Sequence, residues 1–131
     1  MMAPRIVLPF LAALLVAGCG ASEEPAGSGE VAQLVVRVDP DGSGSGRATE
    51  TRLRCSSARE SAVCAEAAGL EAADLAKADP DAACTDLFGG PETARIVGEL
   101  HGRPVDARFA RNNGCEIARW EKVAPLLKAA G

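Results

Sequence analysis

Residues 94–111 read ARIVGELHGRPVDARFAR, and this stretch decides the fold because it predicts a β-hairpin. The His101-Gly102 pair supplies a tight turn, since glycine tolerates the positive φ that such turns need. Pro104 cannot donate a ladder hydrogen bond, so we expect it at a sheet edge. Alternation of apolar and polar residues in both arms gives one inward-facing set: Ile96, Leu100, Val105, Ala107 and Phe109.

The same alternation predicts two half-buried strands earlier in the chain, over residues 31–38 and 49–55. Their inward-facing residues are Leu34, Val36, Val38, Thr51 and Leu53. The segment that joins them, DPDGSGSG over residues 39–46, is rich in turn-forming residues and predicts an irregular hairpin loop.

Helical sequence lies between and after these strand pairs. The segment Ser57-Ala-Arg-Glu60 matches a capping box and predicts a helix that runs to Ala68, with a further turn or two over 71–78. A second helix is expected over residues 116–128, where Pro125 should kink or divide it. We therefore predict an α+β domain, an antiparallel sheet of four to five strands covered by two helices.

The N-terminal sequence predicts export. Residues 1–18 carry a positive charge followed by an apolar run of about 12 residues, too short for a stable membrane span. The segment Leu15-Val-Ala-Gly-Cys19 resembles the bacterial lipobox, so we expect cleavage before Cys19 and attachment of lipid to its thiol. Residues 19–30 are polar and predict a flexible tether, which leaves 31–131 as one extracytoplasmic domain anchored to the cell membrane.

Five cysteines are present, and the assignment of Cys19 to lipid leaves four for the folded domain. In an exported domain of this size, four cysteines predict two disulfides, which have three possible connectivities. The four are Cys55, Cys64, Cys84 and Cys115.

Composition and spacing argue against several other classes of protein. A net charge of −4 without a basic run is not typical of nucleic-acid binding. We expect no metal site, because no Cys-x-x-Cys pair occurs, His101 is the sole histidine and the calcium-like spacing from Asp39 to Glu50 has strands on both sides. No nucleophile and base are arranged for catalysis, so we expect neither an enzyme nor a bound cofactor.

Several motifs between Leu34 and Cys115 occur together in one known family. They are Leu34-Val-Val-Arg-Val38, Thr51-Arg-Leu-Arg-Cys55, Cys64, Cys84, Ile96-Val-Gly-Glu-Leu-His-Gly-Arg-Pro-Val105 and Phe109-Ala-Arg-Asn-Asn-Gly-Cys115. In these motifs the chain resembles the Streptomyces subtilisin inhibitor-like proteins, secreted inhibitors of serine proteases. The resemblance implies the bridges Cys55–Cys64 and Cys84–Cys115. It also leaves a homodimer open, since the family commonly dimerises through its sheet.

The resemblance also implies a reactive loop that binds an extracellular serine protease. In this family the scissile bond follows the second residue after the third cysteine of the domain, which here is the bond from Asp86 to Leu87. The implied contact residues are Thr85, Asp86, Leu87 and Phe88, with loop support from Asn112 and Asn113.

Asp86 makes the choice of target less simple. Its carboxylate would lose its water in an apolar specificity pocket, at a cost of several kcal/mol unless it is paired. Three interpretations therefore stay open: a protease with a basic pocket, a shifted register that uses Leu87 or Phe88, or an envelope lipoprotein that does not inhibit and binds another protein.

Overall fold

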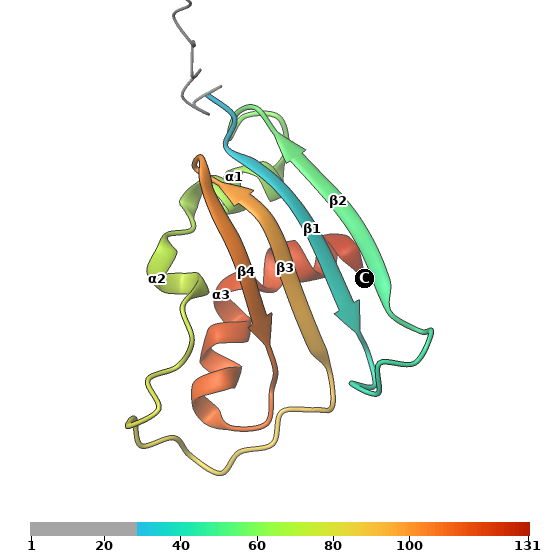
Figure 1. The fold of residues 1–131 in the computed structure, drawn as a ribbon, viewed down its shortest axis with the longest axis vertical. Coiled ribbons are helices and arrows are strands. Elements are labelled where there is room, and N and C mark those ends of the chain that lie inside the picture. The colour runs from blue at the N-terminus through green and yellow to red at the C-terminus, as the bar shows by residue number, and fades with distance from the viewer. Residues whose placement is uncertain (1–28) are drawn as a thin grey trace, which may run out of the picture.

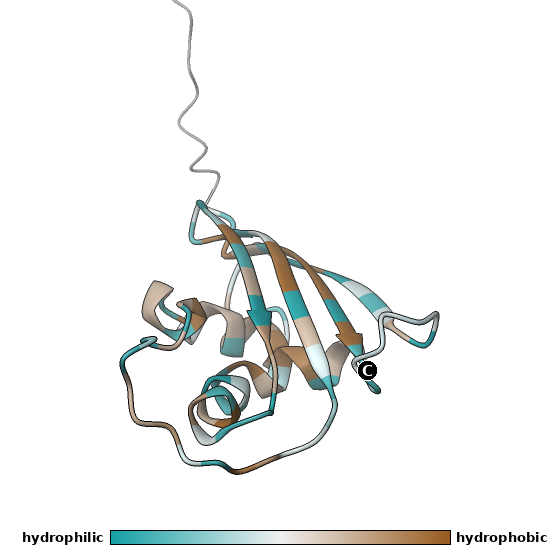
Figure 2. Ribbon diagram, turned by 60° about the horizontal axis from the view of Figure 1, so that its bottom comes forward, coloured by the Kyte–Doolittle hydropathy of each residue, from teal (hydrophilic) through white to brown (hydrophobic). Residues whose placement is uncertain are grey.

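The computed structural model describes residues 29–131 as a four-stranded antiparallel sheet with three helices, all on one face of the sheet (Figures 1 and 2). This confirms the predicted α+β class. The predicted signal peptide (1–18), the lipidation site Cys19 and the tether up to residue 28 lie outside the described residues.

The sheet contains β1 (Ala32–Asp39), β2 (Thr49–Cys55), β3 (Thr93–Leu100) and β4 (Arg103–Phe109) in the order β2-β1-β3-β4. The four strands match the four that the alternation predicts. Their inward-facing side chains meet the helices and form the core, while none of the three described helices lies on the opposite face of the sheet (Figure 2). The largest fully buried side chains are Phe109, Ile96, Leu126, Val36, Val123 and Cys55.

The predicted hairpin between β3 and β4 is present. His101 and Gly102 both have positive φ, 51° and 73°, as a two-residue hairpin turn of type I′ requires. The exposed His101 ring contacts the carbonyl oxygen of Leu70 at 3.0 Å, which ties the turn to the helical layer. Pro104 lies in β4, an edge strand, as predicted.

The first helix, α1 (Ala62–Gly69), begins later than the sequence predicts. Its N-cap is Ser61, whose hydroxyl accepts a hydrogen bond from Cys64 N at 3.2 Å. Glu60 instead accepts hydrogen bonds from the backbone N–H groups of Ser56 and Ser57. The bond from Ser57 N to Glu60 is the glutamate half of the predicted capping box, but no helix begins there. The predicted helix start is therefore wrong, because residues 57–60 turn the chain from β2 toward the helix.

The helical segment predicted over 71–78 is a single turn, α2 (Ala72–Leu75), with Glu71 and Asp74 forming its capping box. The third helix, α3 (Gly114–Ala130), is longer than predicted and runs unbroken through Pro125. It changes direction along its length (Figure 1), which agrees with a kink rather than a division. Buried residues on both sides of the proline hold α3 against the sheet: Val123, Ala124, Leu126, Leu127 and Ala130.

Two disulfides join the helices to the rest of the domain, in the pairing that the resemblance implies. Cys55 and Cys64 form a buried bridge from the end of β2 to α1. Cys84 and Cys115 form a half-buried bridge from the long connection before β3 to the first turn of α3.

Candidate functional site

The segment that follows Cys84 runs without helix or strand past the N-terminal end of α3 (Figure 1). At its start the Cys84–Cys115 bridge fixes the backbone to the helix. Residues 76–92 as a whole connect α2 to β3, and only part of this connection is held by contacts to the rest of the domain.

Two backbone hydrogen bonds hold the segment on either side of the predicted scissile bond. Gly114 N donates to the carbonyl oxygen of Thr85 at 2.9 Å. Four residues later, Gly89 N donates to the carbonyl oxygen of Arg111 at 2.6 Å. Residues 86–88 therefore form a short projection between two anchored ends, which we call the clamped loop.

Both anchors depend on close packing against the start of α3. A Cβ atom at Gly114 would overlap the Thr85 hydroxyl oxygen, so glycine lets Thr85 lie directly on the helix terminus. A Cβ atom at Gly89 would come within 3.0 Å of the Ile117 side chain. Both ends of the clamped loop thus pack against α3, and their backbone hydrogen bonds join one end to the first residue of the helix and the other to Arg111 just before it.

The clamped loop presents its side chains to solvent. Leu87 is 61% exposed and Phe88 is 70% exposed, and within residues 29–131 these are the exposed large hydrophobic side chains. Thr85 and Asp86 are exposed as well. Large apolar side chains held in water by a fixed backbone are typical of a surface that binds a partner.

The structure gives the two predicted support residues different positions. Asn113 is the N-cap of α3, where its side-chain oxygen accepts a hydrogen bond from Glu116 N at 2.9 Å. Asn112 is exposed. In the described part of the chain neither side chain hydrogen-bonds to residues 84–91, so their support of the loop stays a prediction.

Arg111 supports the loop and was not found by sequence reasoning. Its carbonyl oxygen holds Gly89, its guanidinium pairs with Glu92 at 3.1 Å, and its Cζ lies 5.8 Å from the centre of the Trp120 ring. Arg111 therefore links the exit of the loop to α3 and to the core. The sequence gives no sign of this pair, because Arg111 and Glu92 lie in separate segments whose approach depends on the fold.

Comparison of the chain with models of protein families, with curated proteins and with solved structures gave no match. The resemblance to subtilisin inhibitor-like proteins rests on the motifs and stays a prediction.

Three further findings concern the surroundings of the domain and its capacity to bind a metal ion. The two disulfides indicate an oxidising, extracytoplasmic compartment. Within residues 29–131, no helix has both the length and the apolar character needed to cross a membrane. The same residues contain no group of three or more potential ligand side chains placed to hold a metal ion.

Proposed function

We propose that this chain is an extracytoplasmic inhibitor of serine proteases, of the subtilisin inhibitor-like type, held at the outer face of the cell membrane by lipid on Cys19. The contact region is Thr85 to Phe88. The observation that carries the proposal is the clamped loop, which exposes Leu87 and Phe88 between two ends fixed by a disulfide and two backbone hydrogen bonds.

Such a loop suits inhibition because it can enter a protease cleft without first becoming ordered. A preorganised segment loses little conformational entropy on binding, so more of the contact energy appears as affinity. The anchors also lie on both sides of the bond from Asp86 to Leu87. After cleavage, the Cys84 bridge would hold one new end and the Gly89 hydrogen bond the other. The two ends would stay close enough for the bond to re-form.

The specificity of the loop depends on which side chain enters the main pocket of the protease. Asp86 requires a pocket with a cationic group, because an unpaired carboxylate is costly to bury. Leu87 or Phe88 would suit an apolar pocket if the register shifts by one or two residues. The exposure of these two apolar residues supports the shifted register for proteases with apolar pockets.

Titration against a panel of serine proteases tests the proposal. The panel includes subtilisin-like, trypsin-like and acid-accepting enzymes, and the inhibitors are the natural chain, Asp86→Met and Asp86→Lys. Methionine removes the charge and should strengthen inhibition of subtilisin-like enzymes, whereas lysine should direct the loop to trypsin-like enzymes.

Each variant is first checked for two intact disulfides by mass. If the natural chain and both folded variants inhibit no protease on the panel, the clamped loop is not inhibitory. Phe88→Ala is a further control, since this exposed residue contributes to contact without contributing to the core.

A second candidate function is a non-inhibitory envelope lipoprotein that binds another protein through Leu87 and Phe88. The charge of Asp86, at the position where the resemblance places the scissile bond, favours this alternative. A negative result over the whole panel, with folded protein, would support it.

The lipid anchor has its own test. Cys19→Ala in the native host should move the protein from the membrane fraction to the medium or the soluble envelope fraction. The natural protein should carry a lipid mass on Cys19 at its mature N-terminus. Unchanged membrane retention of the variant would contradict the anchor without bearing on inhibition.

A further inference from the structure

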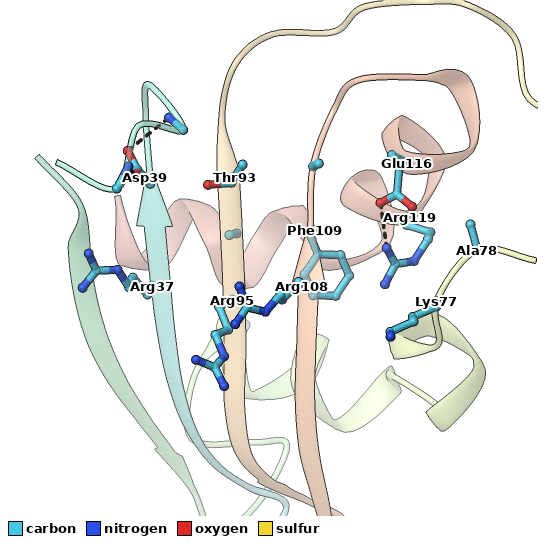
Figure 3. Close-up of a pocket in the computed structure, with 14 residues that line it drawn as sticks. Arg37, Asp39, Lys77, Ala78, Thr93, Arg95, Arg108, Phe109, Glu116 and Arg119 are labelled. Atoms are coloured by element: carbon cyan, nitrogen blue, oxygen red, sulfur yellow. Dashed lines mark hydrogen bonds and ion pairs between the residues drawn. The ribbon is translucent and has the colours of Figure 1, made fainter. Parts of the chain in front are cut away.

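Three arginines lie side by side across the helix-free face of the sheet, and we call them the arginine row. Arg95 in β3 is in register with Arg37 in β1 and with Arg108 in β4. All three are exposed, and they line one side of an open cavity of about 730 Å³ (Figure 3). Like charges directly opposite each other on antiparallel strands are destabilising. The row therefore costs stability unless an anion lies against it.

The neighbouring carboxylates compensate the row only in part. Asp106 accepts two hydrogen bonds from the Arg95 guanidinium, at 2.9 and 2.8 Å, and this contact lowers the pKa of Asp106. Asp39 is engaged elsewhere, since its carboxylate accepts from three backbone N–H groups of the loop after β1. In the described part of the chain, Arg37 and Arg108 form no ion pair.

The face as a whole, with the arginine row included, is broad and carries more positive than negative charge. Within residues 29–131, the helices cover only the other face of the sheet (Figure 2), and no other element of that range covers the outward face. Its exposed charged residues are five arginines and three carboxylates, and the buried Asp39 is a fourth carboxylate, although the chain as a whole has a net charge of −4. The exposed ones are Arg37, Arg52, Arg54, Arg95 and Arg108, with Glu50, Glu99 and Asp106.

The shape of this face indicates the kind of anion. Val35 and Val97 are partners in register, two positions along their strands from Arg37 and Arg95, and both are half-buried. The arginines extend over three strands, each about 4.8 Å from the next, rather than closing around one point. A flat array of cations with apolar residues between them fits an extended anionic surface better than a single small ion.

We propose that the helix-free face of the sheet binds an anionic phospholipid surface, with the arginine row contacting lipid phosphates. The planar guanidinium group presents paired donors that match the oxygens of a phosphate. This binding does not depend on protease inhibition. The clamped loop follows the helix side of the domain (Figure 2), where Cys84 joins α3. A sheet lying on the bilayer therefore leaves the clamped loop on the side of the domain away from the lipid.

Vesicle sedimentation of the full chain tests the proposal. One set of vesicles contains equal parts of phosphatidylglycerol and phosphatidylcholine, and the other contains phosphatidylcholine alone. The ratio of the two partition coefficients cancels binding that does not depend on lipid charge. The N-terminal segment, which carries Arg5, is the same in every variant compared, so its contribution to the ratio does not differ between them. Each arginine near an anionic surface strengthens binding about fivefold, so Arg37→Gln with Arg108→Gln should lower the ratio about 25-fold. High salt should lower the ratio of the natural chain as well.

The matched control removes two charges from outside the sheet, Arg59→Gln with Lys128→Gln, and should keep the ratio close to that of the natural chain. Both double variants are checked for two disulfides and for an unchanged circular dichroism spectrum. The proposal is wrong if the natural chain shows no preference for anionic vesicles, or if both double variants lose the preference equally.

Two further experiments distinguish other occupants of this face. If tripolyphosphate raises the melting temperature of the natural chain while the vesicles show no preference, the site binds a soluble phosphate and the membrane proposal fails. If analytical ultracentrifugation shows a dimer that Arg37→Gln with Arg108→Gln dissociates, a second copy covers the face, and the membrane proposal fails in that case too.

Discussion

Removal of the Cys84–Cys115 bridge is the most direct test of the clamped loop. The change is Cys84→Ala together with Cys115→Ala. The bridge closes a segment with a sequence separation of 31, for which the chain-entropy relation gives a loss of about 3.7 kcal/mol from the free energy of unfolding. Because both cysteines are only half-buried, alanine removes little packing, and most of the loss should come from the freed unfolded chain.

The same change should also loosen the loop in the folded protein. Its two remaining backbone anchors, Gly114 N to Thr85 O and Gly89 N to Arg111 O, contribute only about 0.5–1.5 kcal/mol each. We therefore expect rapid and permanent cleavage of the variant by any protease that the natural chain binds.

Urea denaturation followed by circular dichroism measures the first effect, and the rate of cleavage in the folded baseline measures the second. A loss of stability below about 1 kcal/mol would refute the entropic reasoning. An unchanged cleavage rate would show that the bridge does not hold the loop.

Three further predictions concern the scaffold. Phe109→Ala removes a core side chain that is only 2% exposed, so the free energy of unfolding measured by urea denaturation should fall by about 3–5 kcal/mol. A fall below about 1 kcal/mol would contradict the place of Phe109 in the core. Gly114→Ala should cost about 1–3 kcal/mol because the new methyl group overlaps the Thr85 hydroxyl, and Thr85→Ala in the same chain should restore most of the loss. The side-chain hydrogen bond from Lys122 lowers the pKa of Asp74 below 3.8, so the stability from this contact is present above pH 3.8 and is lost as the pH falls through the lowered pKa. Lys122→Met should raise the Asp74 pKa in an NMR titration, and no change would contradict the contact.

Alternation in the sequence predicts which face each strand buries, but it does not predict which strands are neighbours. Leu34 and Ile96 face the core as expected, because a period of two fixes the side of the sheet on which each residue lies. The position of β1 between β2 and β3 depends on tertiary packing. For this reason the arginine row, which exists only through the pairing of Arg37, Arg95 and Arg108, could not be predicted from the sequence.

The candidate site could likewise be predicted from the sequence only in part. Its position after Cys84 and its disulfide followed from motifs that are local in sequence. The anchors that shape the loop are contacts between distant segments, Thr85 with Gly114 and Gly89 with Arg111, and local patterns do not encode them. The start of α1 was also misplaced, because Ser57 and Ser61 both suit an N-cap and only the turn out of β2 selects Ser61.

The two proposed binding surfaces lie on different sides of the domain. The described chain enters β1 at one end of the sheet, and residues 84–91 pass the other end (Figure 1). The arginine row lies on the helix-free face, whereas Cys115 fixes the loop to α3 on the covered face. A protease that contacts Leu87 and Phe88 would approach from the helix side, where it would not compete with lipid for Arg37 or Arg108. Binding at one surface should therefore leave the other accessible, so that a domain resting on the bilayer can still present its loop to an enzyme in the surrounding medium.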